Sequence, residues 1–395
     1  MKTIGIICEY NPFHNGHAHQ LHSLAQLHPD ALRICIMSGS FVQRGEPAIC
    51  SKFDRARWAI LGGADIVIEL PTIYSTGSAQ LFGTGSIRMV KALSMDALSF
   101  GSETADLDAL IDIAKRMDCE STQEQLRTYI NEGMSYGAAF RKALETDVLN
   151  TPNALLGLEY IRAGLAYHPN LEYMPILRTS NHHKETITDE LPSGTALRQL
   201  ITNNNNLSTQ LRSSIQTSMV SDMIQVIENS NYVDYNRYYD MVHSLSRRTP
   251  PQELEKYGDF SEGIEHLWSK AAQQPSWTTA TEEIKSKRYT YARLQRMGAY
   301  LTLGITKDIL QSAMEVGPQY ARLLAFNDRG RQWLRNEYEI PLIQKWAKAP
   351  NELSLFGQTM YHIDTLATDI QSLCLHNESN RTGHRDYTYT PQYIK

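Results

Sequence analysis

Cysteine is scarce in this chain, and no segment is apolar for long enough to cross a membrane. The cysteines are Cys8, Cys35, Cys50, Cys119 and Cys374. They show no paired spacing, and with no secretory leader in view we expect reduced thiols and a cytoplasmic protein. No apolar run approaches the roughly 20 residues that a membrane helix requires. The sequence therefore predicts neither a disulfide framework nor a membrane partner.

The chain also has no large excess of positive or negative charge. The formal net charge of −5 gives no overall attraction to nucleic acid, so an RNA partner needs a local basic patch. At 395 residues, 42% of them hydrophobic, the chain is long enough for two globular domains. A run of asparagines, 203–206, marks the predicted boundary. We predict a catalytic domain over 1–202, a mainly α-helical domain over 207–375, and a polar, partly disordered tail over 376–395.

Strand and helix patterns alternate in the first half. The strand-like apolar runs are 3–8, 32–37, 65–70, 97–100 and 173–177. Helical spacing separates them, which predicts an α/β, Rossmann-like domain with a parallel sheet whose ligands bind at the carboxyl ends of the strands. Pro175 places the last of these strands at an edge. In the mainly helical second half, 320–326 and 340–345 are further candidate strands.

The first strand runs into a loop that contains two histidines. After an Asn-Pro break come His14, Gly16 and His17, and helical spacing then resumes. The first turn of a helix offers unpaired N–H groups and the positive end of its dipole to a phosphate. Both histidines could donate to phosphate oxygens, and Gly16 leaves room for a flat ring. A zinc site from His14, His17 and His19 is the alternative, although no Cys-x-x-Cys pair or acidic cluster supports it.

Two further loops contain candidate anion ligands. The glycine-rich loop after the second strand includes Arg44, and Lys52 and Arg55 open the next helix, where a cation opposes the dipole unless an anion is bound. Arg44 and Lys52 form a candidate phosphate loop, with a solvated surface loop as the alternative. Ser193, Thr195 and Arg198 open a later helix and predict a second phosphate cradle facing the first. An ordinary N-cap with a surface arginine is the other interpretation.

Basic and aromatic residues alternate in two segments of the second half. The candidate RNA-binding residues are Lys287, Arg288, Arg293, Arg296, Arg329 and Arg331. Basic side chains hold phosphates while neighbouring aromatic rings stack on unpaired bases, so these segments predict contact with folded RNA. The alternative is that they are simply solvated helix faces.

Together these motifs resemble one family. The histidine loop is similar to the signature of nucleotidylyltransferases and class I aminoacyl-tRNA synthetases. With the segments 37–48, 63–71, 100–103, 152–153 and 287–294, and with Arg178, most of the chain resembles the bacterial tRNA(Met) cytidine acetate ligases. The departures are Ser51, where an acidic residue is expected before Lys52, and Ser193-Gly194-Thr195 in place of a Ser-Ala pair.

The resemblance implies a ligase that works in two steps. Acetate attacks the α-phosphate of ATP, with Mg²⁺ as the expected counter-ion, and the acetyl group then passes to N4 of the wobble cytidine of elongator tRNA(Met). His14 and His17 are the candidate catalytic pair. The ATP-binding residues that the resemblance implies are Ile7, Cys8, Glu9, Tyr10, Asn11, Pro12, Phe13, His14, Asn15, Gly16, His17, Gln20, Gly101, Asn153 and Arg178, to which we add Ser193, Thr195 and Arg198.

Two other functions stay open at this point. An adenylyltransferase acting on a small phosphorylated metabolite would share the first half, but it leaves the basic and aromatic segments without a role. A non-catalytic RNA-binding protein with a degenerate nucleotide fold is the second alternative. The intact His14, Gly16 and His17 argue against it, because a degenerate site has no reason to keep them.

Overall fold

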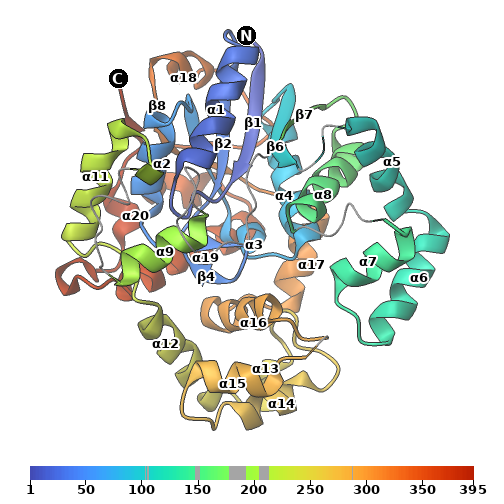
Figure 1. Ribbon diagram of the computed structural model, residues 1–395. Helices are drawn as coiled ribbons and strands as arrows, with labels where there is room; N and C mark the ends of the chain where they lie inside the picture. Colours follow the sequence, from blue (N-terminus) through green and yellow to red (C-terminus); the bar gives the residue numbers. More distant parts are fainter. Residues whose placement is uncertain (103, 105, 147–151, 178–192, 204–212, 287) are drawn as a thin grey trace.

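One mostly parallel sheet dominates the protein, as the computed structural model shows (Figure 1). The structure describes residues 1–102, 104, 106–146, 152–177, 193–203, 213–286 and 288–395. The strand order is β10-β8-β5-β2-β1-β6-β7, with β9 beside β8. The strands are β1 (Thr3–Cys8), β2 (Leu32–Ser38), β5 (Ile66–Leu70), β6 (Ala97–Ser102), β7 (Glu172–Leu177), β8 (Ala321–Phe326), β9 (Leu342–Ile343) and β10 (Gln392–Tyr393); β3 (Phe41–Val42) and β4 (Glu46–Pro47) form a separate hairpin.

The central strands are parallel and apolar on both faces. In the register, Ile6 of β1 lies opposite Cys35 of β2 and Ser99 of β6, and Ile36 of β2 lies opposite Ile68 of β5. All five side chains are fully buried. Strands covered on both faces lose the in-out alternation of a half-exposed sheet and become continuous apolar runs. The predicted Rossmann-like parallel sheet is confirmed, and β7 with its proline lies at one edge.

The helices of the first half follow the strands in alternation. They are α1 (Asn15–Leu27), α2 (Lys52–Leu61), α3 (Thr72–Ser75), α4 (Ala79–Ala92), α5 (Leu107–Met117), α6 (Glu120–Asn131), α7 (Tyr136–Leu144) and α8 (Pro152–Tyr167). Serine hydroxyls cap α2 and α4, where Ser51 accepts from the Asp54 N–H and Ser78 from the Leu81 N–H. Figure 1 shows α5, α6 and α7 as a lobe beside α8.

The second half is mainly helical, as predicted. Its helices are α9 (Gly194–Asn203), α11 (Thr217–Glu228), α12 (Tyr235–Arg248), α13 (Pro251–Leu254), α14 (Ile264–Ala271), α15 (Trp277–Ile284), α16 (Tyr291–Leu303), α17 (Lys307–Val316), α18 (Asp328–Trp333), α19 (Leu355–Leu373) and α20 (Arg385–Thr388), with 3-10 turns η2 (Trp346–Glu352) and η3 (Glu378–Asn380). In Figure 1, α12 to α16 gather below the sheet, whereas α18 lies at its top. Within the described residues, none of the helices has both the length and the apolar composition to span a bilayer.

The sheet takes strands from both sides of the predicted boundary near residue 202. Strand β8 pairs antiparallel with β5, with Ile66 opposite Phe326, and β10 then pairs with β8. The candidate strands at 320–326 and 340–345 are therefore real, as β8 and β9. The segment 376–395, predicted as a polar, partly disordered tail, contains η3, α20 and β10, and Asp386 is fully buried.

Candidate active site

The histidine loop forms the N-terminus of α1 at the carboxyl end of β1. His14 is the N-cap residue, and its Nδ1 accepts from the Gly16 N–H at 3.1 Å. The His17 Nδ1 accepts from the His14 N–H at 3.3 Å, which completes a reciprocal capping box. Because each Nδ1 acts as an acceptor, the proton of each neutral ring belongs on Nε2. The two Nε2–H groups are therefore the donors available to phosphate oxygens.

The two imidazoles stack on one another and are held by aromatic neighbours. Their ring centroids are 3.8 Å apart with an interplanar angle of 22°. Tyr10 lies 4.7 Å from the His17 ring and Phe13 lies 5.6 Å from it, measured between centroids. Both Tyr10 and Phe13 are buried, and burial raises the pKa of Tyr10 well above its usual range. The aromatic wall therefore fixes the ring positions without adding charge.

The start of α9 meets this loop, as the predicted second cradle requires. The Arg198 Nη1 donates to the Asn11 carbonyl at 2.8 Å, and its Nη2 donates to the Thr195 hydroxyl at 3.1 Å. A Cβ added to Gly194 would lie 3.4 Å from the Asn11 oxygen and 3.9 Å from the His14 Nε2. The Ser193 hydroxyl accepts from the Ala196 N–H at 3.2 Å. Two helix N-termini with a guanidinium between them thus converge on one place, which favours an anion.

Arg55, the second cation near the start of α2, ties the neighbouring loops together. Arg55 has no exposed surface, and its Nη1 donates to the Glu9 carbonyl at 2.7 Å and to the Ser38 carbonyl at 3.0 Å. Its other nitrogens donate to the carbonyls of Gly39 and Cys50. Burial lowers its pKa to about 10. Arg55 therefore fixes the chain where β1 and β2 end and leaves a positive charge beneath the histidine loop.

The hairpin β3-β4 continues the loop after β2 and joins the site to the lower helices. Arg44 is exposed at its tip, and the charges of Arg198 and Arg44 both act on Glu46. The Gly45 carbonyl accepts from the Tyr238 hydroxyl at 3.1 Å. Gly45 has φ +80, and a Cβ there would lie 2.5 Å from the Arg296 backbone nitrogen. The predicted phosphate role of Arg44 stays a prediction, and the structure places its loop beside α9 and α16.

Lys52 has a different environment from the one its prediction requires. It is fully buried, and its Nζ lies 2.8 Å from Glu69 Oε1 and 3.0 Å from Asp386 Oδ1. Arg322 joins the same group, 2.9 Å from Asp386 and 3.4 Å from Glu69. The charge of Lys52, which opposes the dipole at the start of α2, is thus neutralised by buried carboxylates. The structure does not bring Lys52 together with the histidines, and these contacts give it a structural role.

The remaining predicted ATP ligands lie around the same edge of the sheet, as far as the structure describes them. The Gln20 Nε2 donates to the Ser99 hydroxyl of β6 at 3.2 Å. Gly101 follows on β6, at the end of the sheet where β1 also finishes. Helix α8 begins at Pro152, so Asn153 belongs to its first turn. The Asn153 side chain and Arg178 lie outside the described residues.

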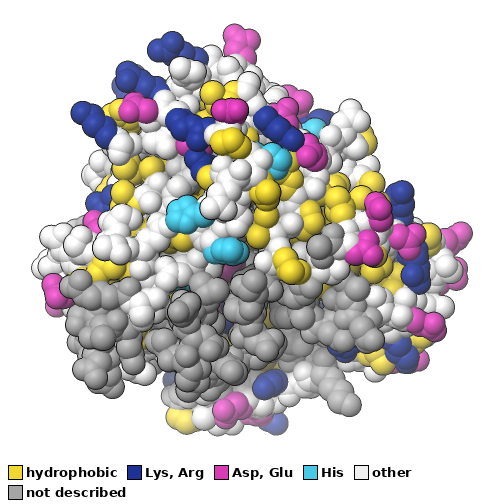
Figure 2. All heavy atoms as spheres, turned by 45° about the horizontal axis from the view of Figure 1, so that its top comes forward, with side chains coloured by type: hydrophobic (Ala, Val, Ile, Leu, Met, Phe, Trp, Pro, Cys, Tyr) yellow, Lys and Arg dark blue, Asp and Glu magenta, His cyan; other side chains and the backbone are white. Residues whose placement is uncertain are grey.

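The two predicted RNA-binding groups lie far apart. Helix α16 carries Arg293 and Arg296 below the carboxyl edge of the sheet, with Arg288 just before it, whereas Arg329 and Arg331 belong to α18 at the top (Figure 1). Figure 2, with that top turned forward, shows Lys and Arg side chains interspersed with acidic ones. Lys287 lies outside the described residues. Of the two groups, only the one on α16 lies on the side of the histidine loop, and the RNA-binding role of both stays a prediction.

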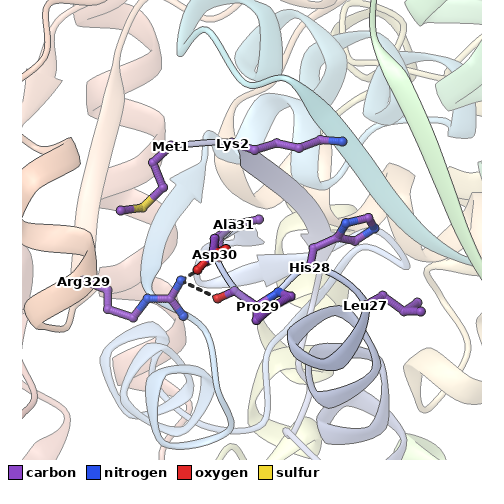
Figure 3. A pocket seen from close by; sticks show the side chains of 8 residues that line it. All are labelled: Met1, Lys2, Leu27, His28, Pro29, Asp30, Ala31 and Arg329. Atoms are coloured by element: carbon purple, nitrogen blue, oxygen red, sulfur yellow. Dashed lines mark hydrogen bonds between the residues drawn. The ribbon is translucent and has the colours of Figure 1, made fainter.

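A hollow in the surface lies away from this chemistry. It has a volume of about 720 Å³ and is lined by Met1, Lys2, Leu27, His28, Pro29, Asp30, Ala31 and Arg329. Figure 3 shows Arg329 reaching across it, where its Nη2 donates to the carbonyls of Pro29 and Ala31, each at 3.0 Å. Met1 and Lys2 precede β1, residues 27–31 precede β2, and Arg329 follows β8, which runs antiparallel to β5, so the hollow is at the amino ends of the parallel strands. Ligands of parallel α/β sheets bind at the opposite end.

The described residues place no metal cluster behind the histidines. Over the part of the chain that the structure describes, no three His, Cys, Asp or Glu side chains are grouped so that they could hold a metal ion. His19 is exposed on α1, while His14 is buried at its cap. The zinc alternative therefore has no support from the geometry. The arrangement suits an anion bound by neutral N–H donors and a guanidinium.

Known proteins match the chain over nearly its full length. The family model described as HIGH Nucleotidyl Transferase matches residues 1–386. A protein of Acetivibrio thermocellus named tRNA(Met) cytidine acetate ligase is 31% identical, over 98% of this chain and 99% of its own. One of the same name from Alkaliphilus metalliredigens is 31% identical, over 100% and 99%. The crystal structure of apo Thermotoga maritima TmcAL has a TM-score of 0.95 at 28% identity, covering both chains completely. The same protein bound with α-thio ATP gives a TM-score of 0.92 at 28% identity, over 100% and 99%.

Proposed function

We propose, from the premise that this chain belongs to the tRNA(Met) cytidine acetate ligase family within the HIGH nucleotidyl transferases, that it activates acetate with ATP and acetylates the wobble cytidine of elongator tRNA(Met). The enzyme is a ligase. The observation that carries the proposal is the stacked pair His14 and His17 at the start of α1, with α9 and Arg198 meeting it. The ATP analogue bound by the T. maritima protein agrees with this type of site.

In the first step we assign charge stabilisation to the two imidazoles. As acetate attacks the α-phosphate, negative charge builds on its oxygens, and the Nε2–H donors of His14 and His17 stabilise it. Arg198 neutralises the same charge from the α9 side. Preorganisation supports this assignment, because capping and stacking already hold both rings in position. Acetyl-adenylate and pyrophosphate are the products.

The other ATP contacts are assigned by motif. We propose that the loop from Ile7 to Gln20, with Gly101, Asn153 and Arg178, surrounds the nucleotide, and that Ser193 and Thr195 contribute at the second cradle. Magnesium would arrive with the ATP phosphates, which are its usual ligands together with water. Because the described chain offers no matching group of carboxylates, no step is assigned to the metal.

In the second step AMP is the leaving group and the cytidine N4 amine takes the acetyl group. We propose that the tRNA approaches from the α16 side, since Arg288, Arg293 and Arg296 are near the carboxyl edge of the sheet. The full-length match to ligases disfavours an adenylyltransferase for a small metabolite, which would need no such helices. It equally disfavours a non-catalytic RNA-binding protein. Cytoplasmic location is proposed from the free thiols of the described cysteines.

A coupled assay tests the proposal. Exchange of labelled pyrophosphate into ATP is measured with and without acetate, and mass spectrometry of the wobble cytidine then follows transfer. Acetate-dependent exchange with acetylation at N4 is the expected result. Pyrophosphate exchange that does not depend on acetate would point to an adenylyltransferase for another substrate. The absence of exchange would refute the catalytic assignment.

A further inference from the structure

A group of polar side chains connects the histidine loop to the helices below it, and the adenylation step does not use it. Its members, here called the acceptor cluster, are Glu46, Tyr235, Tyr239, Tyr291 and Gln295. We propose that Glu46 accepts the hydrogen bond, and then the proton, of the exocyclic amine of a cytosine base that stacks on Tyr291. The inference rests on the proposed function, because it gives the activated acetyl group its acceptor site.

The acceptor cluster begins where the α-phosphate site ends. Arg198 donates to the Asn11 carbonyl in the histidine loop, and the charge of the same guanidinium acts on Glu46. Tyr235 lies beside Asn11 and also within the electrostatic reach of Glu46 and Arg198. In Figure 1, β4, which contains Glu46, lies between α9 above and α16 below. A base in this cluster would therefore be next to an adenylate held by the histidines.

Glu46 has the environment of a proton acceptor. Its Oε1 accepts from the Tyr239 hydroxyl and from the Gln295 side-chain amide, which are both neutral donors. Burial is the largest influence on the pKa of Glu46 and raises it, whereas the charges of Arg198 and Arg44 and the two neutral donors act in the opposite direction. A carboxylate that keeps its proton affinity serves as a general base, and Asp and Glu are the side chains that accept from cytosine N4.

Two more features of the cluster suit an incoming base. The Tyr235 hydroxyl is buried and makes no hydrogen bond of normal geometry within the described chain, although the Asn11 side chain is near enough to lower its pKa. Because buried polar groups are nearly always paired, this hydroxyl can also bond to a polar group of an incoming base. Tyr291, at the start of α16, has 41% of its surface exposed although its ring is large. Exposed aromatic rings next to arginines are how proteins stack single-stranded bases, and Arg293 lies close by, 5.1 Å over the Tyr289 ring.

The proposed transfer step balances. The cytosine N4 forms a bond to the acetyl carbonyl carbon, the bond from that carbon to the phosphate oxygen breaks, and AMP leaves with the electron pair. The amine's surplus proton passes to the Glu46 carboxylate, which is only partly buried and releases it to water. The competing explanation is that Glu46 merely anchors the β3-β4 hairpin to α12 and α16. If Glu46 is only an anchor, its substitution should slow both adenylation and acetyl transfer. If it is a proton acceptor, its substitution should slow acetyl transfer alone.

The test compares the two steps in Glu46→Gln. The readouts are acetate-dependent pyrophosphate exchange, acetylhydroxamate formation when hydroxylamine replaces tRNA, and single-turnover acetylation of elongator tRNA(Met) over a range of pH. We expect exchange and hydroxamate formation within about twofold of wild type, and acetylation slowed about 100-fold. The fall of the acetylation rate toward acidic pH, which reports protonation of the base, should be absent from the variant. Acetylation at the wild-type rate, or an equal fall in both steps, would overturn the assignment.

Further variants separate chemistry from anchoring. Tyr239→Phe removes a bond of the anchor but keeps the carboxylate, so acetylation should fall less than in Glu46→Gln; a loss matching that of Glu46→Gln would favour the anchor. Tyr291→Ala should raise the KM for tRNA, and Tyr291→Phe should restore it, because stacking needs only the ring. If Glu46→Gln does not fold, Glu46→Ala, which also lacks the carboxylate, replaces it under the same criteria. A wild-type protein without acetate-dependent exchange refutes the proposed function itself.

Discussion

Lys52 and Asp386 form an ion pair that spans almost the whole chain. Their charged groups are 3.0 Å apart, 334 residues separate them in sequence, and both side chains are nearly inaccessible to solvent. Burial alone would raise the pKa of Asp386, but Lys52 and Arg322 hold it below its usual range. The four charges of Lys52, Glu69, Arg322 and Asp386 balance, so removing one leaves another uncompensated in the interior.

Asp386→Asn should therefore destabilise the protein strongly. Breaking a buried ion pair by removing one partner typically costs about 3–5 kcal/mol of unfolding free energy. Urea denaturation of the variant and of wild type measures the difference. Asp112→Asn, a matched change at an exposed site on α5, should leave the midpoint almost unchanged. Equal midpoints for wild type and Asp386→Asn would show that the ion group adds nothing to stability.

Asp364 should make stability depend on pH in the direction opposite to an ordinary carboxylate. Burial, with the charge of Glu69 second, raises its pKa to about 7. The unfolded chain releases this proton near the ordinary value of about 3.9, so between these values the folded state binds more protons. This contribution to the unfolding free energy falls as pH rises from about 4 to about 7. Asp364→Asn should lose it, so its denaturation midpoints should fall less steeply with pH than those of wild type; parallel curves would contradict the assignment.

His17→Ala should abolish most acetate-dependent exchange and leave the fold intact. Removing one donor to a developing oxyanion typically costs about 10²–10³ in rate. His19→Ala is the matched control, because His19 is exposed on the same helix, two residues further along. Pyrophosphate exchange and circular dichroism are measured for both. Near-normal turnover in His17→Ala would remove this residue from the catalytic pair.

Charge reversal at Arg288 and Arg293 should weaken tRNA binding and spare adenylation. Removing one basic side chain from a phosphate reduces the slope of log K against log salt by about 1. The comparison is Arg331→Glu on α18, which lies at the other end of the sheet and should bind tRNA as wild type does. Filter binding at several salt concentrations gives the slopes. A larger effect from Arg331→Glu would place the RNA on the α18 side instead.

Local patterns predicted the parts of the fold that depend on neighbouring residues. The isoleucine-rich strands and the histidine loop have signatures that extend over only a few positions. The proline of β7 also located an edge correctly. The site resembles its prediction for the same reason, since His14, Gly16 and His17 supply their own capping geometry.

What the sequence could not provide was the partner of each buried charge. Lys52 at the start of α2 suggested a bound anion, but its carboxylates come from β5 and from a segment classed as disordered tail. Arg55 gave the same misleading signal, because backbone carbonyls at the ends of β1 and β2 satisfy it. Such contacts join residues far apart in the chain, and the spacing of apolar residues in the sequence does not reveal them. Equally, nothing local in β8 indicates that it enters the sheet beside β5 and runs antiparallel to it.

The two edges of the sheet also determine how the protein behaves in a concentrated solution. A long unpaired edge strand offers its N–H and C=O groups to another molecule and promotes aggregation. Here β10 has only two residues, and β7 carries Pro175, which has no N–H to offer. The same features that end the sheet on both sides therefore protect it against strand exchange between molecules.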